Sequence, residues 1–121
     1  MSQTQEQRIL SAIMEKSTGF SPEQRNQLQD RLLQWAGLVQ RCGLLQSWIF
    51  AERKSKTAVG WEEASKLVSS VLVALDCPRL SAETLRDESL IGYQRLQLMT
   101  LEVTSLAARY FDALQAAEES R

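Results

Sequence analysis

Hydrophobic positions along the chain recur at spacings of three and four residues, the spacing of one face of an α-helix. The clearest run begins at Leu28 and continues through Leu32, Trp35 and Val39 to Cys42. No segment alternates apolar and polar residues as a half-exposed β-strand does, and no Asn-Gly or Asp-Gly hairpin turn is present. The pattern therefore predicts an all-α fold, a single-domain bundle of five to six helices.

Start and stop signals divide this pattern into segments. Ser21, Pro22 and Gln24 form an N-terminal capping signature, and Gly19 before them is the expected left-handed cap of the first helix. Gly43 is expected to break the next helix into two. The predicted segments are an N-terminal helix in residues 1–20, a helix pair in 21–56 broken at Gly43, a helix in 61–76, and a short plus a long helix in 81–118, all within one domain spanning 1–121.

Each predicted helix has one apolar face that we expect to form the core. Trp35, Trp48 and Trp61 all lie on such faces. Cys42 and Cys77 are too few and too isolated for a disulfide framework or a metal site, and we expect both to be small buried hydrophobes. The other expected core positions are Ile9, Leu10, Ile13, Met14, Leu44, Leu45, Ile49, Ala51, Ala64, Val68, Val71, Leu72, Leu75, Leu96, Met99, Val103, Leu106, Tyr110 and Leu114.

Composition narrows the class of protein. The chain has 121 residues, of which 44% are hydrophobic and 24% charged, as is typical of one folded domain and unlike a disordered or membrane protein. Residues 1–20 have no apolar run resembling a signal peptide, and no run approaches the ~20 residues that cross a bilayer. We therefore expect a cytoplasmic protein without membrane partners.

Candidate catalytic chemistry is sparse. The chain contains no histidine, which removes the commonest general base and the commonest zinc ligand. Glu62 and Glu63, like Asp87 and Glu88, are sequence neighbours, so their carboxylates point to different sides of a helix and suit its negatively charged first turn. The sequence predicts no enzyme activity, no catalytic residue, no cofactor and no metal site.

The distribution of charge is more informative than the formal net charge of −1. Residues 1–56 carry eight Lys and Arg against five Asp and Glu, whereas residues 57–121 carry six against ten. The positive half includes Arg53, Lys54 and Lys56, with Arg41 as a possible fourth member of the cluster. Such a cluster can bind the phosphates of RNA. The alternative is that it only complements the dipole at a helix C-terminus and keeps the surface soluble.

Three apolar residues fall off the predicted core faces. Phe50 projects between Arg53 and Lys54, where it could stack on a base or pack against a neighbouring helix. Leu98 and Leu101 indicate a surface for a protein partner, or else partial burial. The charged rim of this surface consists of Arg95, Glu102 and Arg109.

Short motifs in both halves of the chain carry a family resemblance. They are residues 43–46 (Gly-Leu-Leu-Gln), Phe50, Lys56, residues 93–96 (Tyr-Gln-Arg-Leu) and residues 102–113, which include an Ala-Arg-Tyr-Phe run. Over roughly residues 25–115 the chain resembles the small α-helical subunit of type III CRISPR–Cas effector complexes, specifically the Cmr type. The family's usual C-terminal tryptophan and lysine fall at Leu106 and Ala108, which leaves the Csm-type small subunit as an alternative.

This resemblance implies a non-catalytic subunit that stacks in copies along a ribonucleoprotein and helps hold the guide–target RNA duplex. The implied partners are CRISPR RNA, target RNA, other type III effector subunits and further copies of the chain. A helical adaptor that binds protein and no nucleic acid remains the alternative function. The expected RNA-binding residues are Arg41, Arg53, Lys54, Lys56, Arg95 and Arg109, and the expected subunit-interface residues are Phe50, Leu98 and Leu101.

Overall fold

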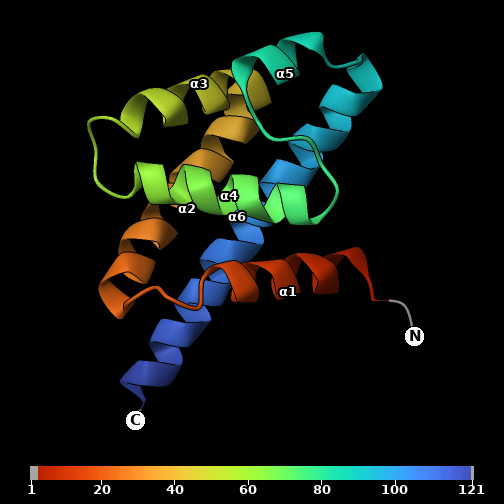
Figure 1. Cartoon of the computed structure of the whole chain (residues 1–121). Helices are drawn as coiled ribbons and strands as arrows, with labels where there is room; N and C mark the ends of the chain where they lie inside the picture. Colours follow the sequence, from red (N-terminus) through yellow and green to blue (C-terminus); the bar gives the residue numbers. More distant parts are fainter. Residues whose placement is uncertain (1–2, 121) are drawn as a thin grey trace.

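A computed structural model describes residues 3–120, where six helices follow one another and no strand occurs (Figure 1). α4 lies across α2 and α6, α1 packs against α4 and α6, and the short α5 lies beside α3. The predicted all-α bundle is confirmed. The helices are α1 (Gln5–Lys16), α2 (Pro22–Cys42), α3 (Leu44–Lys54), α4 (Trp61–Ala74), α5 (Ala82–Asp87) and α6 (Leu90–Glu119).

The first two helices begin with capping boxes. The Ser21 hydroxyl accepts a hydrogen bond from the Gln24 amide at 3.2 Å, and the Gln24 side chain accepts one from the Ser21 amide at 2.9 Å. Pro22 occupies the first helical turn, where its missing N–H is not needed. Thr4 and Gln7 make the equivalent pair at the start of α1. The predicted start of α2 is thus confirmed.

The predicted break at Gly43 is also confirmed, and it brings α6 to the first turn of α3. Gly43 has φ +85° and has no side chain to cap the helix that follows it. Two side chains of α6 act instead: the Leu44 amide donates to Oε1 of Gln97, and the Leu45 amide donates to the hydroxyl of Tyr93, each at 2.9 Å. Residues about fifty positions later in the chain therefore cap α3.

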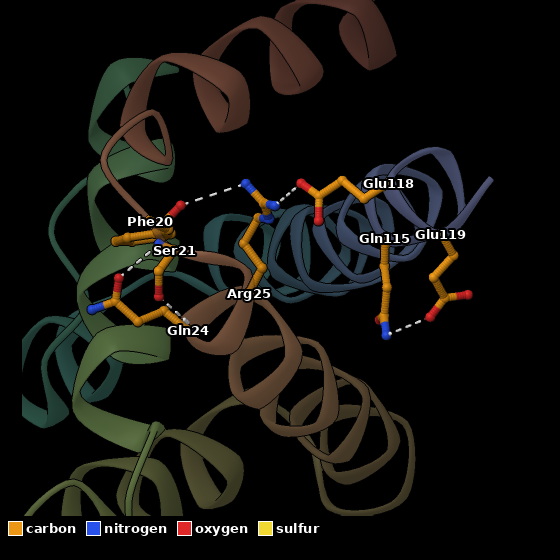
Figure 2. A network of polar contacts seen from close by, with 7 residues as sticks. All are labelled: Phe20, Ser21, Gln24, Arg25, Gln115, Glu118 and Glu119. Carbon is orange, nitrogen blue, oxygen red and sulfur yellow. Dashed lines mark hydrogen bonds and ion pairs between the residues drawn. The ribbon is translucent and has the colours of Figure 1, made fainter. Parts of the chain in front are cut away.

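The opposite end of α6 holds the start of α2 (Figure 2). Arg25 makes an ion pair with Glu118 and also donates to the carbonyl of Phe20 at 3.4 Å. The Phe20 ring meets the ring of Phe111 edge-on, with centroids 6.5 Å apart. In the same last turn of α6, Gln115 donates to Glu119 at 3.2 Å. The start of α2 thus contacts the C-terminal end of α6. The residues that follow Gly43, at the other end of α2, contact α6 near its N-terminal end.

The buried face of α6 differs from the predicted one. Leu96 and Val103 are buried as expected, whereas the other predicted core positions of this helix are only half-buried. Small side chains replace them at the centre of the contact, because they let the backbones of neighbouring helices approach closely. The buried residues of α6 are Leu96, Thr100, Val103, Thr104, Ala107, Ala108 and Phe111.

The three tryptophans occupy the core as predicted. Trp35, Trp48 and Trp61 are all buried. The rings of Trp35 and Trp48 lie 5.9 Å apart, and the Trp35 indole N–H donates to the hydroxyl of Ser47 at 3.3 Å. These contacts join α2 to α3, while Trp61 begins α4 beneath the end of α3.

Several residues predicted to be buried lie closer to solvent. Cys42 is exposed, because it is the last residue of α2 and the chain turns away at Gly43. Met14 and Ile49 are also exposed, since each lies at the margin of a helix face whose centre is occupied by other residues. Cys77 is half-buried in the connection after α4. Leu10, Leu45 and Leu75 are likewise only half-buried.

The predicted role of Gly19 was wrong. Among the described glycines only Gly43 and Gly60 have positive φ, so Gly19 is not a left-handed cap. α1 ends at Lys16 with Ser17 as its cap, and the Ser17 hydroxyl donates to the carbonyl of Ile13 at 2.7 Å. The Ser17 backbone N–H donates to the same carbonyl at 3.0 Å, so serine closes the last turn of α1 without a left-handed residue.

Candidate functional site

The end of α3 gathers half of the predicted RNA-binding residues. Arg53 and Lys54 form the last turn of α3, and Lys56 lies in the turn that follows. All three side chains are exposed, and none makes an ion pair with another described residue. Three positive charges within four residues, next to the negative end of a helix dipole, form a cationic end that is open to an anion. We call Arg53, Lys54 and Lys56 the α3 cationic end.

The remaining predicted cations do not extend this cluster into one ridge. Arg41 precedes Gly43, at the start of α3, and the 11 residues of α3 span about 16 Å. Arg95 lies on α6 beside the two residues that cap that same start. Arg109 lies about 20 Å further along α6 than Arg95. All three are exposed, but they are separate from the α3 cationic end.

Phe50 packs against a neighbouring helix, which is one of the two roles expected of it. Its ring meets Trp61 of α4 edge-on at 5.4 Å between centroids. Lys54 places its ammonium 5.6 Å from the centroid of the Phe50 ring. The side chain remains 36% exposed, so it borders the α3 cationic end.

The outer side of α6 brings together Leu98, Leu101 and Arg109. They line a shallow hollow of about 280 Å³ with Glu6 of α1 and Gln40 of α2. Leu98 is 68% exposed, whereas Leu101 is half-buried. The expected alternative of partial burial therefore holds for Leu101, whereas Leu98 is exposed and the role of the pair at an interface stays a prediction.

Two exposed residues that sequence reasoning missed extend this surface. Leu90 and Ile91, at the start of α6, are 72% and 71% exposed. Ile91 precedes Leu98 by seven residues, a spacing that places both on one side of a helix. This seven-residue spacing is the sequence feature from which the larger surface could have been predicted. We call Leu90, Ile91, Leu98 and Leu101 the α6 outer patch.

A cavity larger than the hollow beside Leu98 lies between α1, α3, α4 and the connection into α5. It has a volume of about 670 Å³, and none of the predicted site residues lines it. The sequence signal for it was weak, because its serines lie on the polar face of α4 and looked like ordinary surface. Its lining is Lys16, Trp48, Glu52, Ser65, Lys66, Ser69, Ser70, Val73, Ala74, Arg79, Leu80 and Ser81.

The cysteines and carboxylates of the described chain do not converge. Cys42 and Cys77 are both free thiols, and partial burial together with the nearby Asp76 carboxylate raises the pKa of the Cys77 thiol. Within residues 3–120 no three His, Cys, Asp or Glu side chains lie close enough to share a metal ion. None of the helices in this range is long and apolar enough to cross a membrane.

Comparison of the chain with protein-family models, with curated proteins and with solved structures gave no significant match.

Proposed function

We propose that the chain is a non-catalytic helical subunit of an RNA–protein assembly. More specifically, we propose a Cmr-type small subunit of a cytoplasmic type III CRISPR–Cas complex, in which it helps hold the guide–target RNA duplex. The observation that carries the proposal is the α3 cationic end, three exposed cations within four residues that make no ion pair inside residues 3–120. The short sequence motifs that resemble the Cmr-type family are the reason for proposing this particular assembly.

The α3 cationic end suits the backbone of a nucleic acid better than its bases. Lysine and arginine side chains bind phosphates and release counterions, which gives affinity without sequence preference. An A-form duplex is recognised mainly through its shape, its phosphates and its 2′-hydroxyls. Phe50, packed on Trp61, is less free to stack on a base than an aromatic ring on an open surface. Catalysis in such an assembly belongs to other subunits.

Contacts between copies of the chain are part of the same proposal. The two halves of the sequence carry opposite net charge, so oppositely charged groups on two copies can attract one another. The α6 outer patch supplies apolar area, and Arg95, Glu102 and Arg109 form a charged rim on the same helix. Glu102 is already engaged, because it accepts a hydrogen bond from Gln5 at 2.8 Å.

A second candidate function uses the α6 outer patch alone. Leu90, Ile91 and Leu98 expose about as much of their side chains as a residue on an open helix does. Exposed apolar residues gathered on one surface mark protein-binding sites. In this alternative the chain is an adaptor that binds a different protein through α6 and does not bind RNA.

The central test is binding to a short RNA duplex as a function of salt. Replacing Arg53, Lys54 and Lys56 together by alanine should weaken binding at low salt and flatten its salt dependence. Each lost phosphate contact removes about 0.7–0.9 from the slope of log K against log salt, so the slope should fall by up to about 2–3. Fluorescence anisotropy at several salt concentrations measures both quantities, and thermal unfolding by circular dichroism should be unchanged.

A matched control removes the same charge from positions outside the α3 cationic end. The triple variant Arg41→Ala, Arg95→Ala and Arg109→Ala also loses three positive charges, but no two of these residues are neighbours in the chain. We expect a smaller loss of affinity than for the α3 cationic end. Equal losses would mean that net charge alone drives binding. Unchanged binding of the α3 variant would contradict the proposal and favour the adaptor.

A further inference from the structure

The cavity between α1, α3, α4 and the connection into α5 has the size of a small-molecule site. Its volume of about 670 Å³ lies within the range of roughly 300–1,000 Å³ that ligand pockets occupy. Trp48 and Leu80 are both buried and give it an apolar lining. Four separate segments contribute to its walls, so it is a feature of the folded chain and not of one helix surface.

Two buried polar groups among the lining residues have no hydrogen-bond partner within the described part of the chain. Trp48 is 8% exposed, and its indole N–H is buried without a hydrogen-bond acceptor. The hydroxyl of Ser65, one helix away, is buried and unpaired as well. Buried polar groups are nearly always hydrogen-bonded, and an indole N–H can only donate. The N–H is enclosed by the protein, but the Trp48 ring lines the cavity, so its signal can report on what binds there.

The charges around the cavity also favour an acceptor-rich, negatively charged ligand. Lys16, Lys66 and Arg79 line it, against the single carboxylate of Glu52. Lys66 is paired with Glu62 at 3.0 Å, whereas Lys16 and Arg79 make no ion pair with another described residue. The hydroxyls of the lining serines add further donors. Arginine and lysine beside several hydroxyls are suited to a phosphate group.

We propose that this cavity binds a phosphate monoester, with Lys16 and Arg79 contacting the phosphate and the Trp48 ring forming part of the wall beside it. Such a group occurs in a free phosphorylated metabolite and at the 5′ end of an RNA. The inference does not rest on the proposed function, because Arg53, Lys54 and Lys56 do not line the cavity.

The indole N–H signals in nitrogen-15 NMR spectra of the full chain provide a direct test. The three tryptophans give three such signals, and Trp48→Phe assigns one of them. Titration with adenosine 5′-monophosphate or inorganic phosphate should move the Trp48 signal more than those of Trp35 and Trp61. Adenosine, which lacks the phosphate, should leave it in place. A shift with adenosine equal to that with the monophosphate, or no shift at millimolar phosphate, would overturn the proposal.

Variants locate the phosphate within the cavity. Arg79→Ala and Lys16→Ala should each weaken binding of the monophosphate by roughly tenfold, the loss expected of one charge-assisted hydrogen bond. Both side chains are exposed, so the fold should be unaffected. Arg8→Ala removes the same charge from an exposed position outside the cavity and should change binding little. Equal weakening by all three variants would show that net charge alone determines the affinity, and it would overturn the proposed site.

Two RNA probes separate the possible sources of the phosphate. A short single-stranded RNA with a 5′-phosphate and the same RNA with a 5′-hydroxyl should differ at the Trp48 signal if RNA ends enter the cavity. If they do not differ while adenosine 5′-monophosphate still binds, the ligand is a free metabolite. The α3 cationic end variant should lose affinity for the RNA duplex but keep the shift of the Trp48 signal with adenosine 5′-monophosphate. Either proposal can therefore be wrong while the other holds.

Discussion

Gln97 occupies a position where one side chain determines how a distant helix begins. Its Oε1 accepts from the Leu44 amide, one of the N–H groups that a helix start leaves without a partner inside the helix. Tyr93 satisfies the next amide in the same way. The first turn of α3 thus depends on α6 for both acceptors.

Replacing Gln97 by alanine should therefore destabilise the fold. The half-buried start of α3 would lose an acceptor, at a cost of about 1–2 kcal/mol in the free energy of unfolding. Gln94→Ala is the matched control, because it makes the same change on the exposed side of the same helix. Urea denaturation measures both variants, and equal stability of the two would show that the Gln97 contact contributes nothing.

Single residues were also where the sequence was least informative. The burial of Trp35, Trp48 and Trp61 was predicted correctly, because a large aromatic ring on the apolar face of a helix is rarely left exposed to water. Cys42 belonged to the same face but is exposed, since its burial depended on where the chain turned. The roles of Gln97 and Tyr93 as caps had no local signal, because the amides they serve lie about fifty residues earlier in the chain.

At the scale of helices, chain breaks were predicted well and packing faces less well. The starts of α2, α5 and α6 follow serine caps, which are local signals. The contact face of α6 is different, because it depends on the partner. Large residues at three- and four-residue spacing predicted one stripe, but Ala107 and Thr104 are buried and Leu106 only half-buried. Periodicity locates a helix more reliably than it locates its centre of contact.

The corner between α2 and α3 requires a glycine, and the turn after α1 does not. Gly43 has φ +85°, and a Cβ there would lie 3.3 Å from Oε1 of Gln97, so Gly43→Ala should cost at least 1–2 kcal/mol, estimated from the left-handed strain alone. Gly19→Ala should be neutral or stabilising by up to about 1 kcal/mol, since a Cβ there meets nothing within 4 Å. Thermal unfolding of both variants checks the pair, and similar losses in the two would contradict the distinction.

At the scale of the whole molecule, the candidate surfaces are built from different sets of residues. Sequence reasoning identified the cations that form the α3 cationic end because they are neighbours along the chain. It could not separate them from Arg41 and Arg109, whose distance from Lys56 depends on how the helices cross. The 670 Å³ cavity was missed for the same reason, because its walls come from four segments.

Association between copies of the chain can be tested through the α6 outer patch. Leu98→Glu should shift any self-association toward monomer, because it places a charge at the centre of the patch. Stability should change by no more than about 0.5 kcal/mol, since the side chain is 68% exposed. Sedimentation velocity over a range of concentrations gives the measurement.

Val59→Glu is the matched control for that variant. Val59 is also 68% exposed but lies in the connection between α3 and α4, away from the patch. It should leave the association constant unchanged. An equal change of the association constant in both variants would contradict the role of the patch in self-association. So would a wild-type chain that stays monomeric at the highest concentration.

The capping of α3 by α6 also orders events during synthesis. A ribosome makes the chain from its N-terminus, so the amides of Leu44 and Leu45 exist well before Tyr93 and Gln97 have been added. Until then neither amide can have its native acceptor, however well α2 and α3 have formed. The corner at Gly43 is therefore among the last parts of the molecule to reach its final form, although it is encoded in the first half.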